Sequence, residues 1–301
     1  MKKKLLYIGM MLLTAIIWGF AFVAQVAGAG SVPTNTFNFL RYVLGVISLI
    51  PVIFVFERKA LKREQYRHYA VASLLTGFVL FSASTLQQYG VMLTGSAGIS
   101  GFITGLYTVL IPIASAILFR EKTRWNVWVG TLCAISGLFL LCYRVGEGFH
   151  FGLGELVLLI GALFWTAHVI IIGRMGQSLP SIHYAMGQFV VCTALSFIAM
   201  VLFEEPSLVG IWDAKWNIAY CGVLSVGVAY TLQVVAQKRI PPAFAAIILS
   251  TESVFSAVGG AIFGYDSITW LGYVGCAIIF FGIVISQVSK KTKTENIESA
   301  Q

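Results

Sequence analysis

The chain has 301 residues, of which 58% are hydrophobic and only 11% charged, and its mean hydropathy is +0.87. A typical soluble domain carries about 25% charged residues, so this composition excludes a soluble domain of ordinary make-up. The net charge of +8 would suit a nucleic-acid partner, but the basic residues cluster between long uncharged segments, which is typical of membrane topology.

The uncharged segments are long enough to cross a bilayer as helices, which takes about 20 apolar residues each. They leave only short connections. We therefore expect an all-α polytopic membrane protein, in contact with the lipid bilayer, that has ten transmembrane helices. In chain order the predicted spans are residues 5–27, 35–56, 69–90, 97–119, 126–143, 153–173, 182–203, 215–236, 243–263 and 268–288.

The charges between the spans predict the orientation of the chain. With the N-terminus in the cytoplasm, every Lys and Arg except Arg41, Arg144 and Lys215 falls on the inner side or at its edge. The longest outer loop, "EEPSLVGIWDA", is acidic. This bias predicts a multi-pass protein of the plasma (inner) membrane with both termini cytoplasmic.

The sequence repeats itself once. "EKTRWNVWVGTLCAISG" (121–137) aligns without gaps to "DSITWLGYVGCAIIFFG" (266–282), and Trp18 in "AIIWGFAF" lies opposite Trp165 in "ALFWTAHV". We expect a first five-helix repeat over 1–145, a second over 146–290 and a cytoplasmic polar tail over 291–301. Five is odd, so the second repeat must be inverted, an architecture typical of secondary transporters. Because Trp18 belongs to the repeat, we expect the first apolar segment to stay in the protein, although it resembles a signal peptide.

The repeated segments resemble the drug/metabolite transporter superfamily, EamA-type. The resemblance rests on "AIIWGFAFV", "FLRYVLG" and "ILFREKTRWNVWVGTLCAISGLFLL" in the first half. In the second half it rests on "GELVLLIGALFWTAHVIIIGR" and "STESVFSAVGGAIFGYDSITWLGYVGCAIIFFGIVI". It implies a central cavity lined largely by spans 1, 3, 4, 6, 8 and 9, and movement of small metabolites such as amino acids, often as export. Ser253 stands where the family usually has a proline, so the usual kink is not expected in span 9.

Two ionisable residues, Arg41 and Glu252, lie within predicted spans, where charge is costly and commonly functional. Arg41 is expected at the outer mouth of the cavity, where it either meets an anionic group of the substrate, pins a gate, or braces neighbouring helices. Glu252 either faces the cavity or bridges helices in its protonated form. A third alternative is that the two residues pair with each other. A cavity with one cation and one anion would suit a zwitterion.

Neutral polar and aromatic residues complete the predicted substrate site. Buried amides need hydrogen-bond partners, so Gln87, Gln88 and Gln233 serve either the substrate or helix association. Trp18 and Trp165 either line the cavity or pack in the core. The candidate substrate-binding residues are Arg41, Glu252, Trp18, Trp165, Gln87, Gln88, Gln233 and His168.

His168 is also a candidate acceptor for a coupling proton, since the ordinary histidine pKa is about 6.5. Pro112 should kink span 4 and act as a hinge. Gly101 and Gly105, in the same span, are candidate hinge or gating positions that equally suit close helix packing.

No catalytic, metal or cofactor motif is recognisable, so no enzyme activity and no cofactor are expected. The leading prediction is a secondary transporter that exports a small organic metabolite by alternating access around a midplane cavity. The alternatives are a flippase-like carrier of a lipid-linked or amphipathic substrate, and an intramembrane enzyme. The sequence leaves the oligomeric state open.

Overall fold

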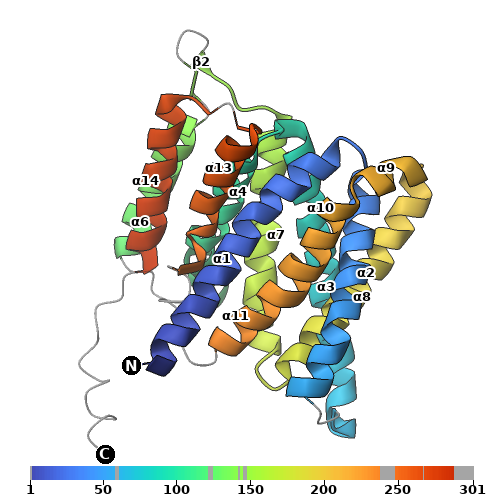
Figure 1. Ribbon diagram of the computed structural model, residues 1–301. Coiled ribbons are helices and arrows are strands. Elements are labelled where there is room, and N and C mark those ends of the chain that lie inside the picture. Colours follow the sequence, from blue (N-terminus) through green and yellow to red (C-terminus); the bar gives the residue numbers. More distant parts are fainter. Residues whose placement is uncertain are drawn as a thin grey trace, which may run out of the picture.

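The computed structural model is a bundle of helices (Figure 1). It describes residues 2–57, 61–120, 125–141, 143–144, 148–237, 248–266 and 268–287. Apart from two short paired strands, β1 (Tyr143–Arg144) and β2 (Gly148–Phe149), the regular structure of this part is helical. The predicted all-α fold class is confirmed.

The first half contains six α-helices and a short 3₁₀-helix, η1 (Arg63–Gln65), within its described residues. The α-helices are α1 (Lys2–Ala29), α2 (Thr34–Phe56), α3 (Tyr66–Thr94), α4 (Ala97–Gly105), α5 (Tyr107–Phe119) and α6 (Trp125–Leu141). The predicted span over 97–119 is present as α4 and α5, and its helix is interrupted at Leu106. There the amide of Leu106 bonds to the carbonyl of Ile103, a tighter 3₁₀-type bond.

The second half contains α7 (Leu153–Met175), α8 (Ser181–Phe203), α9 (Leu208–Asp213), α10 (Lys215–Ala219), the π-helix η2 (Tyr220–Ala229), α11 (Tyr230–Gln237), α13 (Glu252–Phe263) and α14 (Trp270–Gln287). The predicted span 215–236 is therefore not a uniform α-helix. Its middle ten residues are wound as a π-helix, a form that commonly occurs at functional sites.

The helix of the ninth span is also interrupted, although Ser253 replaces the usual proline. Residues 250 and 251 form a turn directly before α13. The Thr251 hydroxyl bonds to the carbonyl of Ile248 at 2.6 Å, and the Thr251 amide bonds to the same carbonyl at 3.1 Å. Hydroxyl side chains that bond back to carbonyls compete with regular helix bonding. The expectation of an unkinked span is wrong for this reason.

The surface of the bundle fits a membrane. Six of the described helical segments are long and apolar enough to cross a bilayer, and three shorter apolar helices accompany them. Large apolar side chains such as Phe54, Phe203 and Leu132 are more than 60% exposed, which is costly in water and favourable in lipid. The protein is a multi-pass membrane protein.

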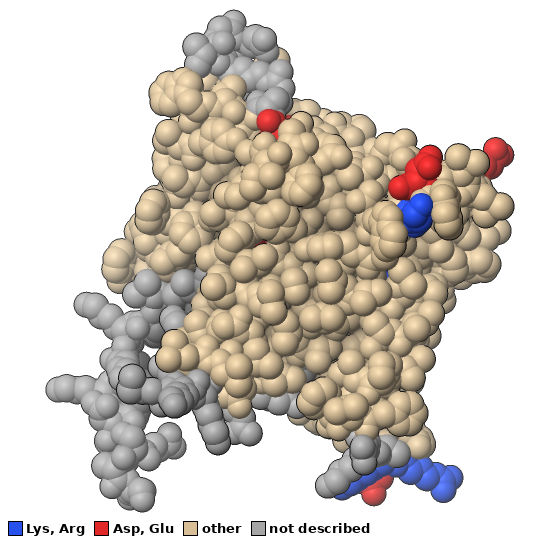
Figure 2. Space-filling view, viewed as in Figure 1, with Lys and Arg blue, Asp and Glu red and all other residues tan. Residues whose placement is uncertain are grey.

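Charged side chains gather at the two ends of the bundle. On the face that Figure 2 shows, acidic groups lie mostly at the upper end and most of the basic groups at the lower end, with a broad uncharged band between them. The acidic end, as we call it, carries Glu204, Asp213 and Asp266, and the basic end carries Lys62, Arg63 and Arg67. This polarity is the pattern expected of a membrane protein whose basic end faces the cytoplasm.

Glycines bring matching helices of the two halves into close contact. A Cβ added at Gly137 of α6 would lie 2.5 Å from the carbonyl oxygen of Gly275 of α14, and one at Gly275 would lie 2.5 Å from that of Gly137. Gly130 and Gly282 approach each other in the same reciprocal way. Small residues that let helix backbones touch are a common device for packing helices in membranes.

Candidate functional site

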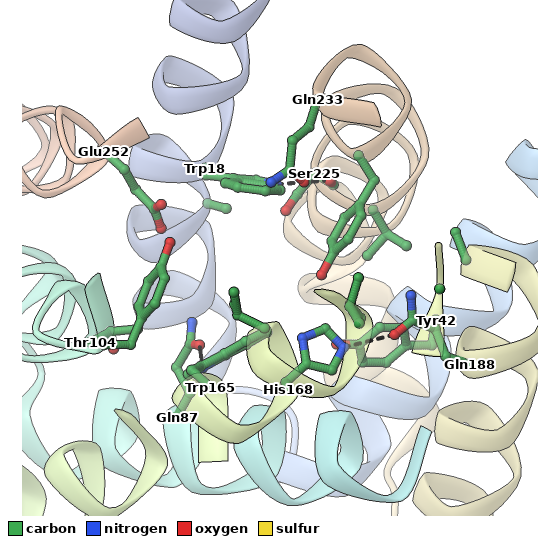
Figure 3. A pocket seen from close by; sticks show the side chains of 18 of the residues that line it. Trp18, Tyr42, Gln87, Thr104, Trp165, His168, Gln188, Ser225, Gln233 and Glu252 are labelled. Atoms are coloured by element: carbon green, nitrogen blue, oxygen red, sulfur yellow. Dashed lines mark hydrogen bonds between the residues drawn. The ribbon is translucent and has the colours of Figure 1, made fainter. Parts of the chain in front are cut away.

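A central cavity of about 550 Å³ lies among helices of both halves (Figure 3). Its volume is typical of a site for a small molecule. The functional side chains on its wall are those of Trp18, Gln25, Arg41, Tyr42, Gln87, Tyr107, Trp165, His168, Gln188, Tyr230, Gln233 and Glu252. These come from α1, α2, α3, α5, α7, α8, α11 and α13. Spans 2 and 7 thus contribute alongside the helices that the resemblance implied.

Arg41 is the basic side chain of this cavity. It lies on α2 and is only 6% exposed. Its Nη1 donates a hydrogen bond to Gln25 Oε1 at 3.1 Å, and its guanidinium lies 5.1 Å from the centre of the Tyr42 ring. Its Nε has no hydrogen-bond partner among the described residues. A buried cation that is held by a neutral amide and an aromatic face retains capacity to bind an anion.

Gln25 and Gln87 join Arg41 to the aromatic wall. Gln87 Nε2 donates to Gln25 Oε1 at 3.3 Å, and Trp165 Nε1 donates to Gln87 Oε1 at 2.8 Å. The chain of bonds therefore runs from α2 through α1 and α3 to α7. Such a connected network fixes the orientation of each polar group on the wall.

Gln88 is placed differently from its neighbour. It is fully buried and donates from Nε2 to the backbone carbonyl of Gln25 at 3.2 Å. It does not belong to the lining of the cavity. Its position fits the alternative role of holding α3 against α1.

Glu252 is the first residue of α13 and lines the cavity. Figure 3 shows its carboxyl on the opposite side of the cavity from Tyr42, the chain neighbour of Arg41. Within the part of the chain that the structure describes, no ion pair joins Glu252 to Arg41. The alternative that the two charges pair directly is therefore not what the structure has.

Trp18 connects α1 to the π-helix. Its Nε1 donates to the carbonyl of Ser225 at 3.0 Å, and the Thr14 hydroxyl donates to the carbonyl of Ala229 at 3.2 Å. In return, the Tyr220 hydroxyl donates to the carbonyl of Ile17 at 3.0 Å. Side chains of α1 therefore bond to two carbonyls of the π-helix, and the bond from Trp18 to Ser225 lies at the cavity wall.

His168 contacts both an amide and an aromatic ring. Its Nε2 lies 2.7 Å from Gln188 Oε1, and its ring packs edge-on against Trp165 with 5.5 Å between ring centres. Gln188 lies on α8, so this pair joins α7 to α8 at the cavity wall (Figure 3).

All the predicted substrate-binding residues except Gln88 line this one cavity. The candidate site residues predicted from the sequence do not include five residues of the wall, namely Gln25, Tyr42, Tyr107, Gln188 and Tyr230. A signal for Gln188 was present, because it follows Arg41 by 147 residues, the spacing that also relates Trp18 to Trp165.

Two of the predicted hinge residues, Gly101 and Gly105, do not line the cavity. Gly101 and Gly105 face α13, where Ser253 Oγ donates to the Gly101 carbonyl at 3.1 Å, and a Cβ added at Gly105 would lie 2.5 Å from Ser253 Oγ. They are close-packing positions, and Gly105 directly precedes the interruption at Leu106. The side chain of Pro112 lies outside the described residues, so its role as a hinge stays a prediction.

The cavity extends toward the basic end of the bundle. Beyond Trp165 and His168 its wall continues along α7 through Gly173 and Gly176 to Ser181 at the start of α8. That stretch is next to η1, where Gln65 Nε2 donates to the carbonyl of Ser178 at 2.8 Å.

An all-α membrane bundle with a polar central cavity is the design of a class of solute transporters. The model of the EamA-like transporter family matches this chain twice, at residues 5–143 and 152–287, so the chain belongs to the EamA-like transporter family.

Relatives agree with this assignment. "Uncharacterized transporter YoaV" of Bacillus subtilis (strain 168) is 23% identical over 277 residues, which cover 90% of this chain and 93% of the relative. "Threonine/homoserine exporter RhtA" of Salmonella typhimurium (strain LT2) is 27% identical over 176 residues, 56% of each chain. A solved structure titled "Crystal structure of protein" has the same fold, with a TM-score of 0.68 at 19% identity, and covers 94% of this chain and 98% of its own.

Proposed function

We propose that this protein exports a small metabolite of the amino-acid class across the plasma membrane, by alternating access around the central cavity. The observation that carries the proposal is Arg41, a buried guanidinium on the cavity wall with no carboxylate partner among the described residues. A solute carboxylate would supply the missing anion through charge-assisted hydrogen bonds.

The opposite wall supports a zwitterion. Glu252 lines the cavity, and no described residue donates a hydrogen bond to its carboxyl. An ammonium group on the solute would meet it there while the carboxylate meets Arg41. The similarity to a threonine/homoserine exporter points to the same class of solute. This polar wall favours a small metabolite over a lipid-linked substrate.

The charge polarity of the bundle supports an orientation with both termini and the basic end in the cytoplasm. The cavity then extends to the cytoplasmic side, as an exporter that loads solute from the cell requires. The Glu252 carboxyl and the His168 imidazole are the candidate sites for a coupling proton, since both side chains line the cavity that would hold the solute.

Efflux from proteoliposomes tests the proposal. Vesicles loaded with radiolabelled threonine or homoserine should release the label faster with the protein than without it. Arg41→Gln should slow this release at least tenfold, since hydrogen bonds to charged groups contribute about 1.5–3 kcal/mol. Arg67→Gln, at an exposed position on α3, is the matched control and should release label at the wild-type rate. Release unaffected by Arg41→Gln would overturn the role of Arg41.

A further inference from the structure

Helices α2 and α8 have the same terminal residues at matching positions of the two repeats. Each helix follows a proline, Pro33 or Pro180, and each is followed by a glutamate, Glu57 or Glu204. Both correspondences have the same spacing of 147 residues that relates Trp18 to Trp165. Neither proline provides a side-chain cap, so the free amides of each first turn need an acceptor from elsewhere.

At the acidic end, the glutamate that follows α8 provides this acceptor for α2. Glu204 Oε1 accepts hydrogen bonds from the backbone amide of Asn35 at 2.7 Å and from its side chain at 2.8 Å. Glu204 Oε2 accepts from the amide of Thr36 at 2.8 Å and from its hydroxyl at 2.9 Å. A carboxylate at a helix N-terminus is also favoured by the helix dipole.

At the basic end, the glutamate that follows α2 provides the acceptor for α8. Glu57 Oε2 accepts from the backbone amide of Ile182 at 2.9 Å and from that of His183 at 3.0 Å, and lies 3.0 Å from His183 Nδ1. Ile182 and His183 follow Asn35 and Thr36 by 147 residues. The two helices are thus antiparallel, and each caps the other.

We propose that α2 and α8 form a strut that stays closed at both ends throughout the transport cycle, while the other helices move around it. Alternating access requires that contacts which act as gates open on one side while they close on the other. The two reciprocal caps are formed simultaneously here, at opposite ends of the bundle. The cap at the basic end is formed although the cavity extends toward that same end, so this cap does not act as a gate there.

The strut positions part of the solute site. Arg41 of α2 and Gln188 of α8 are also related by 147 residues, and both line the cavity. Between them the two helices share a buried contact of Tyr42 with Phe189, whose ring centres are 5.8 Å apart. Glu57 and Glu204 are therefore positioning residues, which keep the Arg41 side of the site constant whichever end of the bundle is open.

Cross-linking tests the strut directly. In a variant whose five native cysteines are replaced by alanine, one cysteine pair replaces Thr36 and Glu204 and a second replaces Glu57 and His183. A short bis-methanethiosulfonate reagent links each pair. If the strut is permanent, the four-cysteine protein acquires both links in one chain, at the yield that the two separate pairs predict. A first link that prevents the second would overturn the proposal.

Flux provides the second readout, and this part alone rests on the proposed function. Doubly linked protein in vesicles should release threonine or homoserine at the rate of its reduced form. Release that stops on linking and returns on reduction would overturn the proposal, even where both links form. If the cysteine-free parent releases neither solute, the proposed substrate is wrong, and the yield of the double link still decides the strut.

The substitutions remove the caps and could weaken folding, so a second variant leaves both caps intact. Phe39 of α2 and Phe197 of α8 have ring centres 5.2 Å apart. In the same cysteine-free background, F39C with F197C should link in high yield without loss of flux or of thermal stability. Arrest of flux by this link would contradict the strut independently of the caps.

Discussion

Replacing Gln87 by leucine tests whether the amide network belongs to the site or only to the packing of helices. Gln87 is 7% exposed, accepts a hydrogen bond from Trp165 Nε1 and donates one to Gln25 Oε1. Leucine has a similar size but can do neither. The indole N–H of Trp165 then has no protein acceptor, and Gln25 Oε1 keeps only its bond from Arg41.

The size of the effect follows from these two bonds. A neutral hydrogen bond contributes about 0.5–1.5 kcal/mol net, and an orphaned buried donor costs about 1–3 kcal/mol. Measured interhelical bonds in a membrane protein average about 0.6 kcal/mol, and water in the cavity can partly satisfy the indole. We therefore expect Gln87→Leu to lower the free energy of unfolding by about 1–2 kcal/mol.

Gln88→Leu is the matched control, because Gln88 is adjacent and buried but does not line the cavity. It should cost about 1 kcal/mol or less, since it removes one bond to a backbone carbonyl. Thermal unfolding in detergent, with and without threonine or homoserine, separates the two variants. Gln87→Leu should lower both stability and the stabilisation by solute, whereas Gln88→Leu should lower stability alone. Equal loss of solute response in both variants would refute this assignment.

Two further predictions concern packing and pH. Gly137→Ala should destabilise the protein by about 1–3 kcal/mol in thermal unfolding, because the new Cβ meets the Gly275 carbonyl. Gly9→Ala is the control and should be neutral or stabilising, because a Cβ there has nothing within 4 Å. Equal effects of the two substitutions would contradict the close contact of α6 with α14. Burial raises the pKa of Asp266, which lies between α13 and α14, although bonds from Ser96 and the Gly98 amide oppose the shift. Because the raised pKa belongs to the folded state, stability should fall as pH rises from about 4, the ordinary aspartate value, to that raised pKa, and then level off. Asp266→Asn should abolish this slope, and a slope unchanged in the variant would assign it to another group.

Much of the fold and of the cavity wall could be predicted from the sequence. Apolar segments of about 20 residues specify spans because backbone groups in lipid must bond within their own helix. The cost of charge in lipid directed attention to Arg41 and Glu252, and both lie on the cavity. The sequence repeat placed Trp18 and Trp165 at matching positions, and both line the cavity. The division of the chain at residue 145 stays a prediction, although the family model matches the chain on both sides of it.

The remaining features depend on contacts between distant segments. The π-helix at Tyr220–Ala229 has an apolar sequence without a proline, and two of its carbonyls accept hydrogen bonds from side chains of α1, more than 200 residues away. Nothing in the sequence around Gln25 and Tyr42 sets them apart from other residues of apolar spans. Their contacts with Arg41 arise only from the packing of the helices. Gln88 was predicted to bind substrate, but its side chain bonds to the backbone of α1 and not to the cavity, although its neighbour Gln87 lines the cavity.

The central claim is that Arg41 binds the carboxylate of the transported solute. The most direct measurement is the affinity of the purified protein for threonine and for threonine amide, in wild type and in Arg41→Gln. We predict that wild type prefers threonine by about ten- to a hundredfold, as expected for a charged hydrogen bond, and that the variant loses this preference. An equal preference in both proteins would show that the carboxylate and Arg41 do not interact, and would contradict the account.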